Sequence, residues 1–465
     1  MEIITIATPS LGDRTYILID GESAAVIDPQ RDIDRIESIL SERHLQLVHV
    51  FETHVHNDYI TGGLELSRKH RCTYVLSDAD TVAFEHTGAQ PGDTFAVGKL
   101  VVTAIATPGH TPTHLSYAVS RDGETSAVFT GGSMLFGTVG RTDLISDAAT
   151  ETLTRQQFQS VRRLADDLPA DAIVYPTHGF GSFCSSTTSS GADASTIGDE
   201  RRKNVAFTVA DEDAFVAELL GGFAAYPRYY AYMAPINRSG PSPVDLTAPA
   251  TLDPVEIRQR IHAGEWVVDL RARTAFARGH LVGTINLAVG ASFATYLGWT
   301  VPWGTPITLV GDSVEEVAEA QRQMVRIGID RPAGSAIGGL DTWAVGGEIR
   351  SYETATFADL MARQSRDDAG EGIVVLDVRR DDERAAGFLA SSVHIPLQDL
   401  AARVDQFTNE FANQTIWVHC ASGYRASLAA SLLDRAGCQV LAIDDDWSAA
   451  LADGTIACTQ PDHQT

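Results

Sequence analysis

The sequence has few cysteines and no long apolar run, and both absences narrow the class of protein. Its 465 residues include only five cysteines, scattered along the chain. A disulfide framework needs a larger paired set, so this usage is typical of a reducing compartment. No stretch reaches the roughly 20 apolar residues of a membrane helix. The first residues also lack the basic start and apolar core of a secretory signal, so we expect a cytoplasmic protein.

Basic residues are scarce as well. The chain has 35 lysines and arginines against 61 aspartates and glutamates, which gives a formal net charge of −26. Nucleic acids and anionic membranes are bound through basic patches, so this balance disfavours both as partners. The apolar fraction of 44% is ordinary for a globular protein. A chain of this length exceeds one hydrophobic core, so we expect about two to four domains.

The most informative stretch of the first half is THVHNDY at 53–59. It follows the apolar run 47–51, which predicts a buried strand that ends in a polar loop. His54 and His56, two positions apart at a strand end, can converge with the carboxylate of Asp58. Imidazole and carboxylate together suit a first-row transition metal. The alternative is a polar loop whose histidines bond to backbone groups.

The surrounding patterns predict a β-rich domain framed by helices. Helical spacing of apolar residues predicts helices over 32–44 and 60–70. The Ser/Thr-rich run 185–198 is predicted to be a flexible connection, with a loop that covers the site as the alternative. The stretch 227–241, aromatic and then rich in Pro and Gly, is predicted to end the domain in a linker. Alternating apolar residues predict strands at 3–6, 16–19, 24–27, 73–76, 94–97, 100–106, 115–119 and 126–130.

Four segments of the first half resemble the metallo-β-lactamase superfamily in order and spacing. THVHNDY resembles its T-H-x-H-x-D-H signature. Its second histidine loop, the strand that usually carries a bridging aspartate, and its last histidine resemble the segments 107–111, 129–133 and 175–179. The resemblance covers residues 1–240 and implies an α/β fold, an αββα sandwich with the site at the rim between its sheets. It adds His110 and His178 to the three candidate metal residues.

Two departures from the family pattern bear on the chemistry. Tyr59 stands where dizinc hydrolases of the superfamily have a histidine, and Gly132 stands where the bridging aspartate is expected. A second metal ion thereby loses a ligand and the carboxylate that screens repulsion between two cations. Iron dioxygenases of the superfamily also use that aspartate, with two histidines. What remains is a three-histidine site, completed by water or by Asp58, while His178 joins it without an assigned role. The three histidines are His54, His56 and His110.

The second half contains an internal repeat. VVDLR at 267–271 recurs as VLDVR at 375–379, and RGHLVGTINL at 278–287 recurs as AGFLASSVHI at 386–395, an offset of 108 residues. Each copy alternates strand and helix, which predicts a parallel sheet with helices on both faces. The copies resemble rhodanese domains, whose D-x-R and G-H-x-x-G-A signatures lie at these places. The second copy departs from that signature at Phe388 and Ser391. The resemblance predicts rhodanese domains at 250–348 and 355–460.

The last copy carries a second candidate site. IWVH at 416–419 predicts a strand that ends at Cys420, and ASGYR at 421–425 leads into a helix. A cysteine at such a junction lies among backbone N–H groups at the positive end of the helix dipole, and these favour its thiolate. The alternative is a small, buried and unreactive cysteine.

The loop resembles the rhodanese active loop, which is one residue shorter than the loop of related phosphatases and suits a sulfur atom on the cysteine. The resemblance assigns Cys420 as the catalytic sulfur acceptor, which forms a persulfide. It assigns Arg425 and the loop amides to hold an anionic donor such as thiosulfate. In the earlier copy, Gly311 stands at the cysteine position and Asp312 follows it, so that copy is expected to be inactive. The substrate-binding loop residues are Ala421, Ser422, Gly423 and Tyr424.

The order of domains resembles bacterial fusions of a persulfide dioxygenase with rhodanese. In that family a mononuclear Fe(II) site oxidises the persulfide of glutathione or another small thiol with O₂ to sulfite. The rhodanese then moves sulfur among persulfide, sulfite and thiosulfate. The resemblance implies one Fe(II) per chain, with zinc as the alternative, and small-molecule sulfur partners. Cys184 is a candidate carrier of sulfur near the metal or a packed cysteine, and a homo-oligomer stays open.

Two other functions stay open. One is a zinc-dependent thioester or lactone hydrolase of the glyoxalase II kind, which needs two metal ions in spite of Tyr59 and Gly132. The other is a metal-free scaffold that serves a thiosulfate sulfurtransferase. The metal content separates the three functions, since they require one iron, two zinc or no metal ion.

Overall fold

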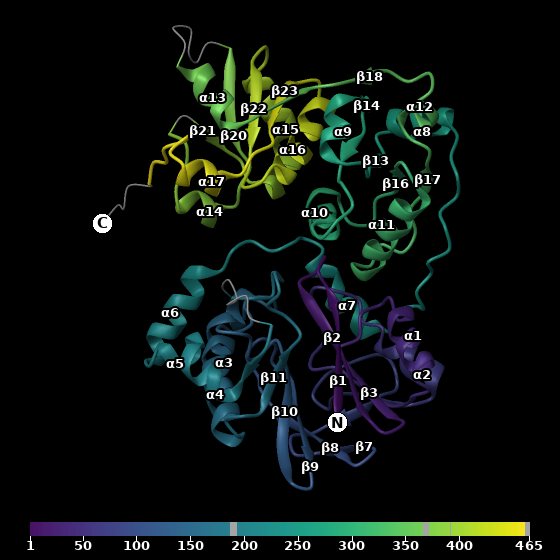
Figure 1. The fold of residues 1–465 in the computed structure, drawn as a ribbon, viewed down its shortest axis with the longest axis vertical. Helices are drawn as coiled ribbons and strands as arrows, with labels where there is room; N and C mark the ends of the chain where they lie inside the picture. Colours follow the sequence, from purple (N-terminus) through teal and green to yellow (C-terminus); the bar gives the residue numbers. More distant parts are fainter. Residues whose placement is uncertain (187–192, 366–371, 391, 461–465) are drawn as a thin grey trace. The chain divides into compact units, whose positions relative to one another are not determined.

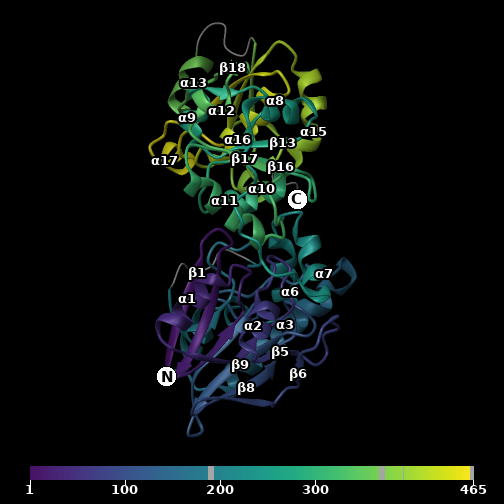
Figure 2. The same ribbon diagram turned by 90° about the vertical axis from the view of Figure 1, so that its right-hand side faces the viewer.

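The computed structural model describes the chain except residues 187–192, 366–371, 391 and 461–465, and its elements are drawn in Figures 1 and 2. The chain forms two compact units. Among the described residues, no helix is long and apolar enough to cross a membrane. The domain boundaries expected from the sequence stay a prediction. The first unit is Met1–Asp245 with Met324–Gly328, and the second is Leu246–Gln323 with Ile329–Thr465.

Two six-stranded sheets form the first unit. The first sheet has the order β1-β2-β3-β4-β5-β6, antiparallel from β1 to β3 and parallel from β3 to β6. The second has the order β12-β11-β10-β9-β8-β7, in which only β10 and β11 pair in parallel. The strands are Glu2–Thr8, Asp13–Asp20, Ser23–Ile27, Gln46–Phe51, Thr73–Ser77, Thr87–Ala89, Thr94–Val97, Leu100–Ala106, Leu115–Arg121, Glu124–Gly131, Ile173–Pro176 and Ser195–Thr196, numbered β1 to β12.

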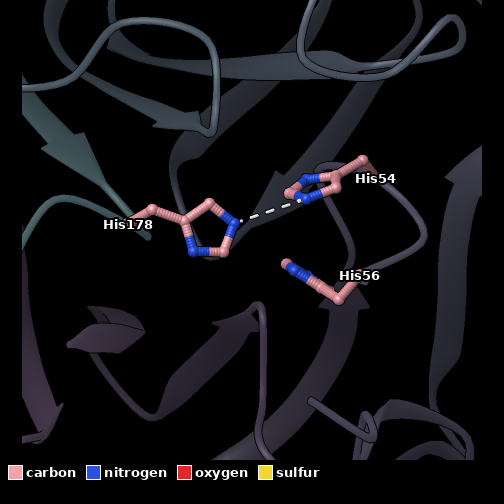
Figure 3. Close-up of side chains that lie close together, drawn as sticks. All are labelled: His54, His56 and His178. Carbon is pink, nitrogen blue, oxygen red and sulfur yellow. Dashed lines mark hydrogen bonds between the residues drawn. The ribbon is translucent and has the colours of Figure 1, made fainter. Parts of the chain in front are cut away.

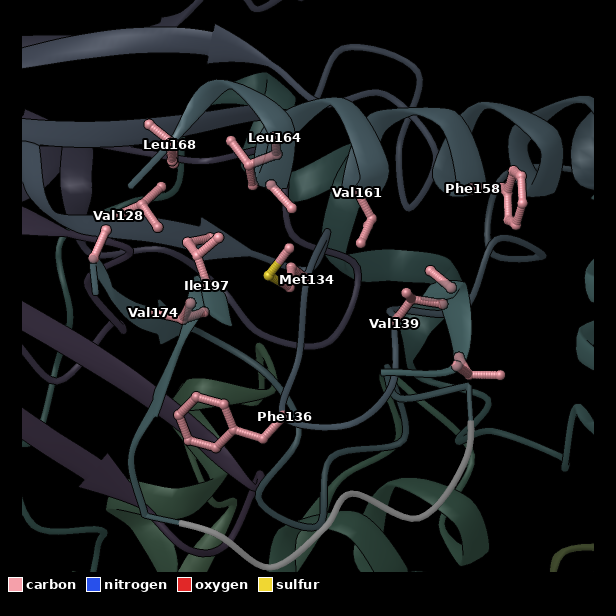
Figure 4. Close-up of a cluster of buried hydrophobic side chains, with 14 of the residues drawn as sticks. Val128, Met134, Phe136, Val139, Phe158, Val161, Leu164, Leu168, Val174 and Ile197 are labelled. Atoms are coloured by element: carbon pink, nitrogen blue, oxygen red, sulfur yellow. The ribbon is translucent and has the colours of Figure 1, made fainter. Parts of the chain in front are cut away.

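Side chains that alternate along the strands explain why helices lie on the outer faces. On β2, Tyr16 and Leu18 pack between the two sheets, whereas Ile17 and Ile19 pack on the outer face with side chains of α1 and α2. On β10, Val128 faces a separate cluster with α3, drawn in Figure 4. The αββα sandwich expected from the sequence is confirmed. The helices are α1 Asp34–Glu42, α2 Gly63–His70, α3 Asp147–Asp167, α4 Ile197–Lys203, α5 Val205–Thr208, α6 Glu212–Gly222 and α7 Tyr230–Ser239.

Two segments of the first unit differ from their predictions. Residues 187–192 of the run 185–198 lie outside the described residues, but its end is not a flexible connection. Ser195–Thr196 is an edge strand, and Thr196 caps α4 through a reciprocal pair of hydrogen bonds with Asp199. The stretch predicted as a linker at 227–241 contains α7, which tolerates Pro235 inside it. Local composition misled in both cases, because capping and tertiary packing stabilise helices that propensity disfavours.

Parallel sheets organise the second unit. One sheet has the order β15-β13-β16-β17 and the other β19-β23-β22-β20-β21, and every pair in both is parallel. The predicted parallel sheets are therefore confirmed. A two-stranded antiparallel ribbon joins β14 and β18. The strands are Trp266–Asp269, His280–Leu281, Ile285–Asn286, Ile307–Val310, Gly334–Ala336, Ile349–Arg350, Glu353–Ala355, Ile373–Asp377, Ser392–His394, Thr415–His419 and Gln439–Ile443, numbered β13 to β23.

Ten helices of the described chain complete this unit or lead out of it. They are α8 Pro254–His262, α9 Arg273–Arg278, α10 Phe293–Thr300, α11 Val314–Arg326, α12 Leu340–Trp343, α13 Phe357–Gln364, α14 Asp381–Ala385, α15 Leu397–Glu410, α16 Tyr424–Arg435 and α17 Trp447–Ala452. The helix α16 follows β22 directly, and it packs on both β22 and β23. This arrangement places the start of α16 at the carboxyl end of a buried parallel strand, where such sheets usually bind ligands.

The sequence repeat is also a repeat of tertiary contacts. Arg271 forms an ion pair with Asp269 and donates to the carbonyl oxygen of Gly279 at 2.9 Å. In the second copy Arg379 forms an ion pair with Asp377 and donates to the carbonyl oxygen of Gly387 at 2.8 Å. Each guanidinium also lies over a tryptophan ring. In both copies the arginine of the D-x-R motif thus ties the end of one strand to the glycine that lies eight residues after that arginine. The two tryptophans are Trp343 and Trp447.

Candidate metal centre and candidate cysteine site

Four histidines converge at one end of the first unit. His54 and His56 follow β4, His110 follows β8 and His178 follows β11. All four are buried, and their ring centroids lie 4.1 to 5.7 Å apart in the pairs that touch. Figure 3 shows the rings of His54, His56 and His178 around a common space. The structure therefore brings together the four histidines that the sequence singled out.

Asp28 fastens two of these loops. Its carboxylate accepts the backbone N–H of Thr53 at 2.7 Å and the hydroxyl of Thr53 at 2.8 Å, and it also accepts the hydroxyl of Thr177. Burial alone would raise the pKa of Asp28, but His56 and these donors hold it below its usual value. Since Thr53 precedes His54 and Thr177 precedes His178, one carboxylate positions both histidine loops.

Three histidines present unprotonated nitrogen to the pocket. Nε2 of His54 and Nε2 of His178 lie 3.4 Å apart, a separation that suits two ligands of one metal ion. Nδ1 of His110 donates to the carbonyl oxygen of Arg141 at 2.7 Å. The Nε2 of His110 therefore carries no proton and has a free lone pair. That Nε2 is buried and has no hydrogen-bond partner among the described residues. Burial lowers the pKa of all three imidazoles, so they are neutral and able to bind a cation.

His56 contacts an acidic cluster as well as the other histidines. Its Nε2 lies 2.9 Å from the hydroxyl of Tyr59, 3.3 Å from Asp28 and 3.2 Å from Glu52. Burial alone would lower the pKa of His56, but the two carboxylates raise it to about 10, so this imidazole is a cation in the absence of metal. The sequence assigned His56 to the metal, and this stays a prediction: one nitrogen each of His54, His56 and His178 lies within 4.8 Å of the others, while Nε2 of His56 contacts the acidic cluster. Its Nδ1 stays without a partner in the described part of the chain.

Asp58 lies against His178. One of its carboxylate oxygens is 3.3 Å from Nδ1 of His178, and Asp13 accepts that same Nδ1 at 2.8 Å. Burial raises the pKa of Asp13 and the pKa of Asp58 to about 7 each. A carboxylate on the outer nitrogen of a ligand histidine orients the ring and raises its basicity. In this geometry Asp58 and Asp13 position His178, because they face the nitrogen opposite the one that points at His54.

Gly132 explains the packing of His110. A Cβ atom at position 132 would lie 2.1 Å from Cδ2 of His110, so the imidazole fills the space of the missing side chain. The backbone N–H of Gly132 donates to Nε2 of His114 at 3.0 Å. Sequence reasoning missed His114, although the motif TPGHTPTH displays it four residues after His110. Its role is structural, because both of its ring nitrogens are hydrogen-bonded.

Cys184 borders the same space. Its Sγ and one nitrogen each of His110 and His178 lie within 4.8 Å of one another, and all three residues are buried. The thiol lies 3.9 Å from the hydroxyl of Tyr230, and burial raises its pKa well above the usual range. The sequence could place Cys184 only near the last histidine, and the structure puts it among the metal candidates.

Two clefts open beside the metal loops. One of about 340 Å³ is lined by Asn57 and Tyr230, and the other of about 420 Å³ is lined by Val55 and Thr111. Both clefts share Ile145 and Arg238 in their walls. The second cleft also contains the carboxylate of Asp80, whose pKa burial raises and the charge of Arg238 partly lowers, whereas Arg238 is the charged side chain in the wall of the first.

In the second unit, Cys420 lies at the end of β22 and is buried. The backbone N–H of Gly423 donates to its Sγ at 3.2 Å, directly before the first residue of α16. Gly423 has a φ of +88°, which a residue with a side chain rarely adopts. Ala421 and Ser422 complete the loop, and its glycine folds it around the sulfur atom. The predicted strand, loop and helix are confirmed.

Arg425 contacts a carboxylate instead of pointing freely into the loop. Its guanidinium donates two hydrogen bonds to Glu383, one of them 2.7 Å long. Burial would raise the pKa of Glu383, but Arg425 and Arg380 hold it below its usual value. The sequence assigned Arg425 to an anionic donor, whereas the structure shows this ion pair clamping the loop to α14. The charge that the loop offers to an anion is thereby reduced.

The first copy reaches the Cys420 loop. The hydroxyl of Tyr424 donates to the carbonyl oxygen of Ala288 at 2.8 Å, and the ring of Tyr296 lies 5.6 Å from that of Tyr424. Burial raises the pKa of Tyr296, and the positive charge of Arg425 partly offsets this rise. Sequence reasoning missed Tyr296, because no motif connects a residue of α10 with a loop more than 100 residues later.

The equivalent loop of the first copy is filled from within. The backbone N–H of Asp312 donates to the carboxylate of Glu316 at 2.7 Å, and a Cβ atom at Gly311 would lie 2.7 Å from that carboxylate. A carboxylate therefore occupies the loop where the second copy holds a sulfur atom.

Comparisons with known proteins agree with this architecture. The metallo-beta-lactamase superfamily matches residues 11–178, and the rhodanese-like domain matches residues 356–453. The mitochondrial persulfide dioxygenase ETHE1 of Homo sapiens is 29% identical over 242 residues, which are 51% of this chain and 82% of that protein. A hydroxyacylglutathione hydrolase of Prochlorococcus marinus is 31% identical over 179 residues, 37% of this chain and 65% of that protein.

A crystal structure of a metallo-beta-lactamase from Staphylococcus aureus is also similar. It has a TM-score of 0.65 and 27% sequence identity, and the likeness covers 73% of this chain and 99% of that chain. This share is longer than the first unit, so the likeness extends beyond it.

Proposed function

We propose that this chain, which belongs to the metallo-beta-lactamase superfamily at residues 11–178 and carries a rhodanese-like domain at 356–453, couples oxidation of a small-thiol persulfide to sulfur transfer through Cys420. It is an enzyme of sulfur metabolism. The observation that carries the proposal is the hydrogen bond that the backbone N–H of Gly423 donates to the Sγ of Cys420 at the start of α16. The similarity to human persulfide dioxygenase supports the oxidation step at the first unit.

Sulfur transfer at Cys420 needs few groups. The thiolate attacks the outer sulfur of thiosulfate, the S–S bond of the donor breaks, and sulfite leaves with the electron pair. The cysteine then carries one additional sulfur atom as a persulfide. A thiol or sulfite attacks that atom, and Cys420 leaves again as the thiolate. The N–H groups of the loop and the dipole of α16 stabilise the anion in both states.

Arg425 positions this loop through its ion pair with Glu383. The first copy (250–348) acts as an inactive rhodanese-like domain, and it supplies Tyr296, which packs on Tyr424 of the loop. We infer that the first copy is inactive because the carboxylate of Glu316 fills the loop that corresponds to the Cys420 loop. A negative group in that place repels an anionic sulfur donor.

The residues of the first unit fit a single metal ion. His54, His110 and His178 would hold it through Nε2, with Asp13 and the Arg141 carbonyl orienting two of the rings. Bound there, an Fe(II) ion would supply the redox chemistry that joins a persulfide to O₂. The cleft lined by Asn57 and Tyr230 would bind the body of the thiol, whose carboxylate pairs with the guanidinium of Arg238.

Hydrolysis with two zinc ions has less support, even though a hydroxyacylglutathione hydrolase is among the relatives. A second ion would compete with Tyr59 for His56, and Gly132 offers no side chain to bridge two ions. A metal-free scaffold is disfavoured by the buried Nε2 of His110, which would stay unpaired in the described structure.

Metal content and activity test the proposal together. Protein purified without chelator should contain one iron per chain and should consume oxygen with glutathione persulfide. Cys420→Ser should lower thiosulfate:cyanide sulfurtransfer by at least about 1,000-fold and leave oxygen uptake unchanged. Cys438→Ser, which replaces a partly exposed cysteine of the same unit, is the matched control. Two zinc ions per chain, or full sulfurtransfer by Cys420→Ser, would contradict the proposal.

A further inference from the structure

We propose that Cys184 is a ligand of the metal centre, together with His110 and His178, and supplies the negative charge that the site lacks at Gly132. The expected cation is a first-row divalent ion that accepts both imidazole and thiolate, such as Fe(II), Co(II) or Zn(II). This ligand set deepens the proposed function and rests on it, because it concerns the same metal centre.

The donor atoms are already close together. The Sγ of Cys184 and one nitrogen each of His110 and His178 lie within 4.8 Å of one another. His110 and His178 are completely buried, and so is Cys184. Nε2 of His110 is unpartnered among the residues that the structure describes, although an unpaired buried nitrogen is costly. A cation between these three groups would remove that cost.

Arg141 holds two of the three groups in place. Its carbonyl oxygen accepts Nδ1–H of His110 at 2.7 Å, and its backbone N–H donates to the carbonyl oxygen of Cys184 at 2.8 Å. The guanidinium donates to the carbonyl oxygen of Phe183 at 3.1 Å and forms an ion pair with Asp143 at 2.7 Å. The relative position of His110 and Cys184 is therefore determined by one buried residue, as expected of a preorganised site.

The missing carboxylate explains why a thiolate is needed. Gly132 has no side chain, and the ring of His110 occupies the space that such a side chain would fill. Three neutral imidazoles carry no negative charge to compensate a buried divalent cation. A thiolate restores one negative charge, and its formation on metal binding releases one proton to the solvent. Cys72, the other cysteine of the first unit, follows α2, is half-buried and packs against the apolar cluster on the outer face of the first sheet.

Spectroscopy of the cobalt-loaded full chain tests this ligand. Co²⁺ is added to protein freed of metal, in a Cys420→Ser background that removes the proposed reactive thiol of the second unit. Binding of one Co²⁺ per chain should produce a thiolate-to-cobalt charge-transfer band in the near ultraviolet. Cys184→Ser should abolish this band and weaken cobalt binding at least about tenfold. Cys72→Ser, the control, should keep both the band and the affinity.

The outcomes separate this ligand from the proposed function. One bound Co²⁺ without the band, or a band that survives Cys184→Ser, overturns ligation by Cys184 and leaves the metal centre intact. Absence of bound Co²⁺ overturns both the ligand and the metal-dependent oxidation. X-ray absorption of the zinc-loaded Cys420→Ser chain gives the answer without replacing Cys184, since a ligating thiolate places one sulfur atom at about 2.3 Å from zinc. A first shell without sulfur contradicts the proposal.

Discussion

Arg425 donates two hydrogen bonds to the carboxylate of Glu383, and this ion pair ties the loop of Cys420 to α14. The arginine that a sequence motif assigns to substrate is thus bound to the protein itself. Its fixed position gives the loop a defined shape before any donor arrives, which is the condition for a preorganised anion site.

Loss of this ion pair should destabilise the second unit. Glu383→Gln leaves the guanidinium of Arg425 without its counter-charge, and we expect a loss of about 1–3 kcal/mol, because the pair is only partly shielded from water. Urea unfolding measures the change. Asp382→Asn, at an exposed neighbouring acid, should stay within about 0.5 kcal/mol of the parent chain. Equal losses in the two variants would contradict a specific role of Glu383.

Tyr296 should affect the binding of the sulfur donor. Its ring packs on Tyr424, and Arg425 acts on its pKa, so Tyr296→Ala should raise KM for thiosulfate about three- to tenfold. Tyr296→Phe keeps the ring and isolates the hydroxyl. Steady-state sulfurtransfer separates the cases: if both variants keep the KM of the parent chain, the first copy contributes nothing to the site.

A methyl group at position 132 should disturb the metal centre. The Cβ atom of Gly132→Ala would overlap the ring of His110, so we expect a loss of stability of about 1–3 kcal/mol and lower metal content. Thermal unfolding and elemental analysis measure both. Gly221→Ala is the control, because a Cβ atom there meets open space within α6. Its stability should stay unchanged or rise by about 1 kcal/mol. Unaltered metal content in Gly132→Ala would show that His110 is free to move.

The second unit should lose stability in acid through His419. Burial lowers the pKa of this histidine to about 4, and its ring stacks on Trp447. Between about pH 6.5 and pH 4 the unfolded chain binds a proton that the folded chain excludes, so stability falls as the pH falls through this window. The full effect is about 3 kcal/mol.

His419→Phe isolates this contribution, because it keeps an aromatic ring on Trp447 and removes the titrating group. Urea unfolding between pH 4 and pH 7 should show a flatter stability curve in the variant. His44→Gln, a substitution of an exposed histidine, is the control variant. A slope that is the same in His419→Phe and in the parent chain would show that other groups determine the acid response.

Much of the fold follows from local patterns. The strands predicted at 16–19, 47–51 and 100–106 all lie within strands of the structure, because alternation and apolar runs act over a few residues. The end of the run 185–198 was predicted wrongly, and so was the linker at 227–241, which contains α7. The capping box of Thr196 and Asp199 is a local signal that the prediction overlooked, whereas the packing of α7 is a tertiary effect that leaves no local pattern.

The sequence alone determined which chemical groups are present and which short loops carry them. His54 and Cys420 each follow an apolar strand, so their exposure to a site could be inferred from their neighbours. Only the tertiary structure decided how those groups are used. It turned His56 toward Glu52, paired Arg425 with Glu383 and brought Cys184 beside His110. These relations join residues that are distant in the chain, or depend on side-chain direction, and both are set by packing of the whole unit.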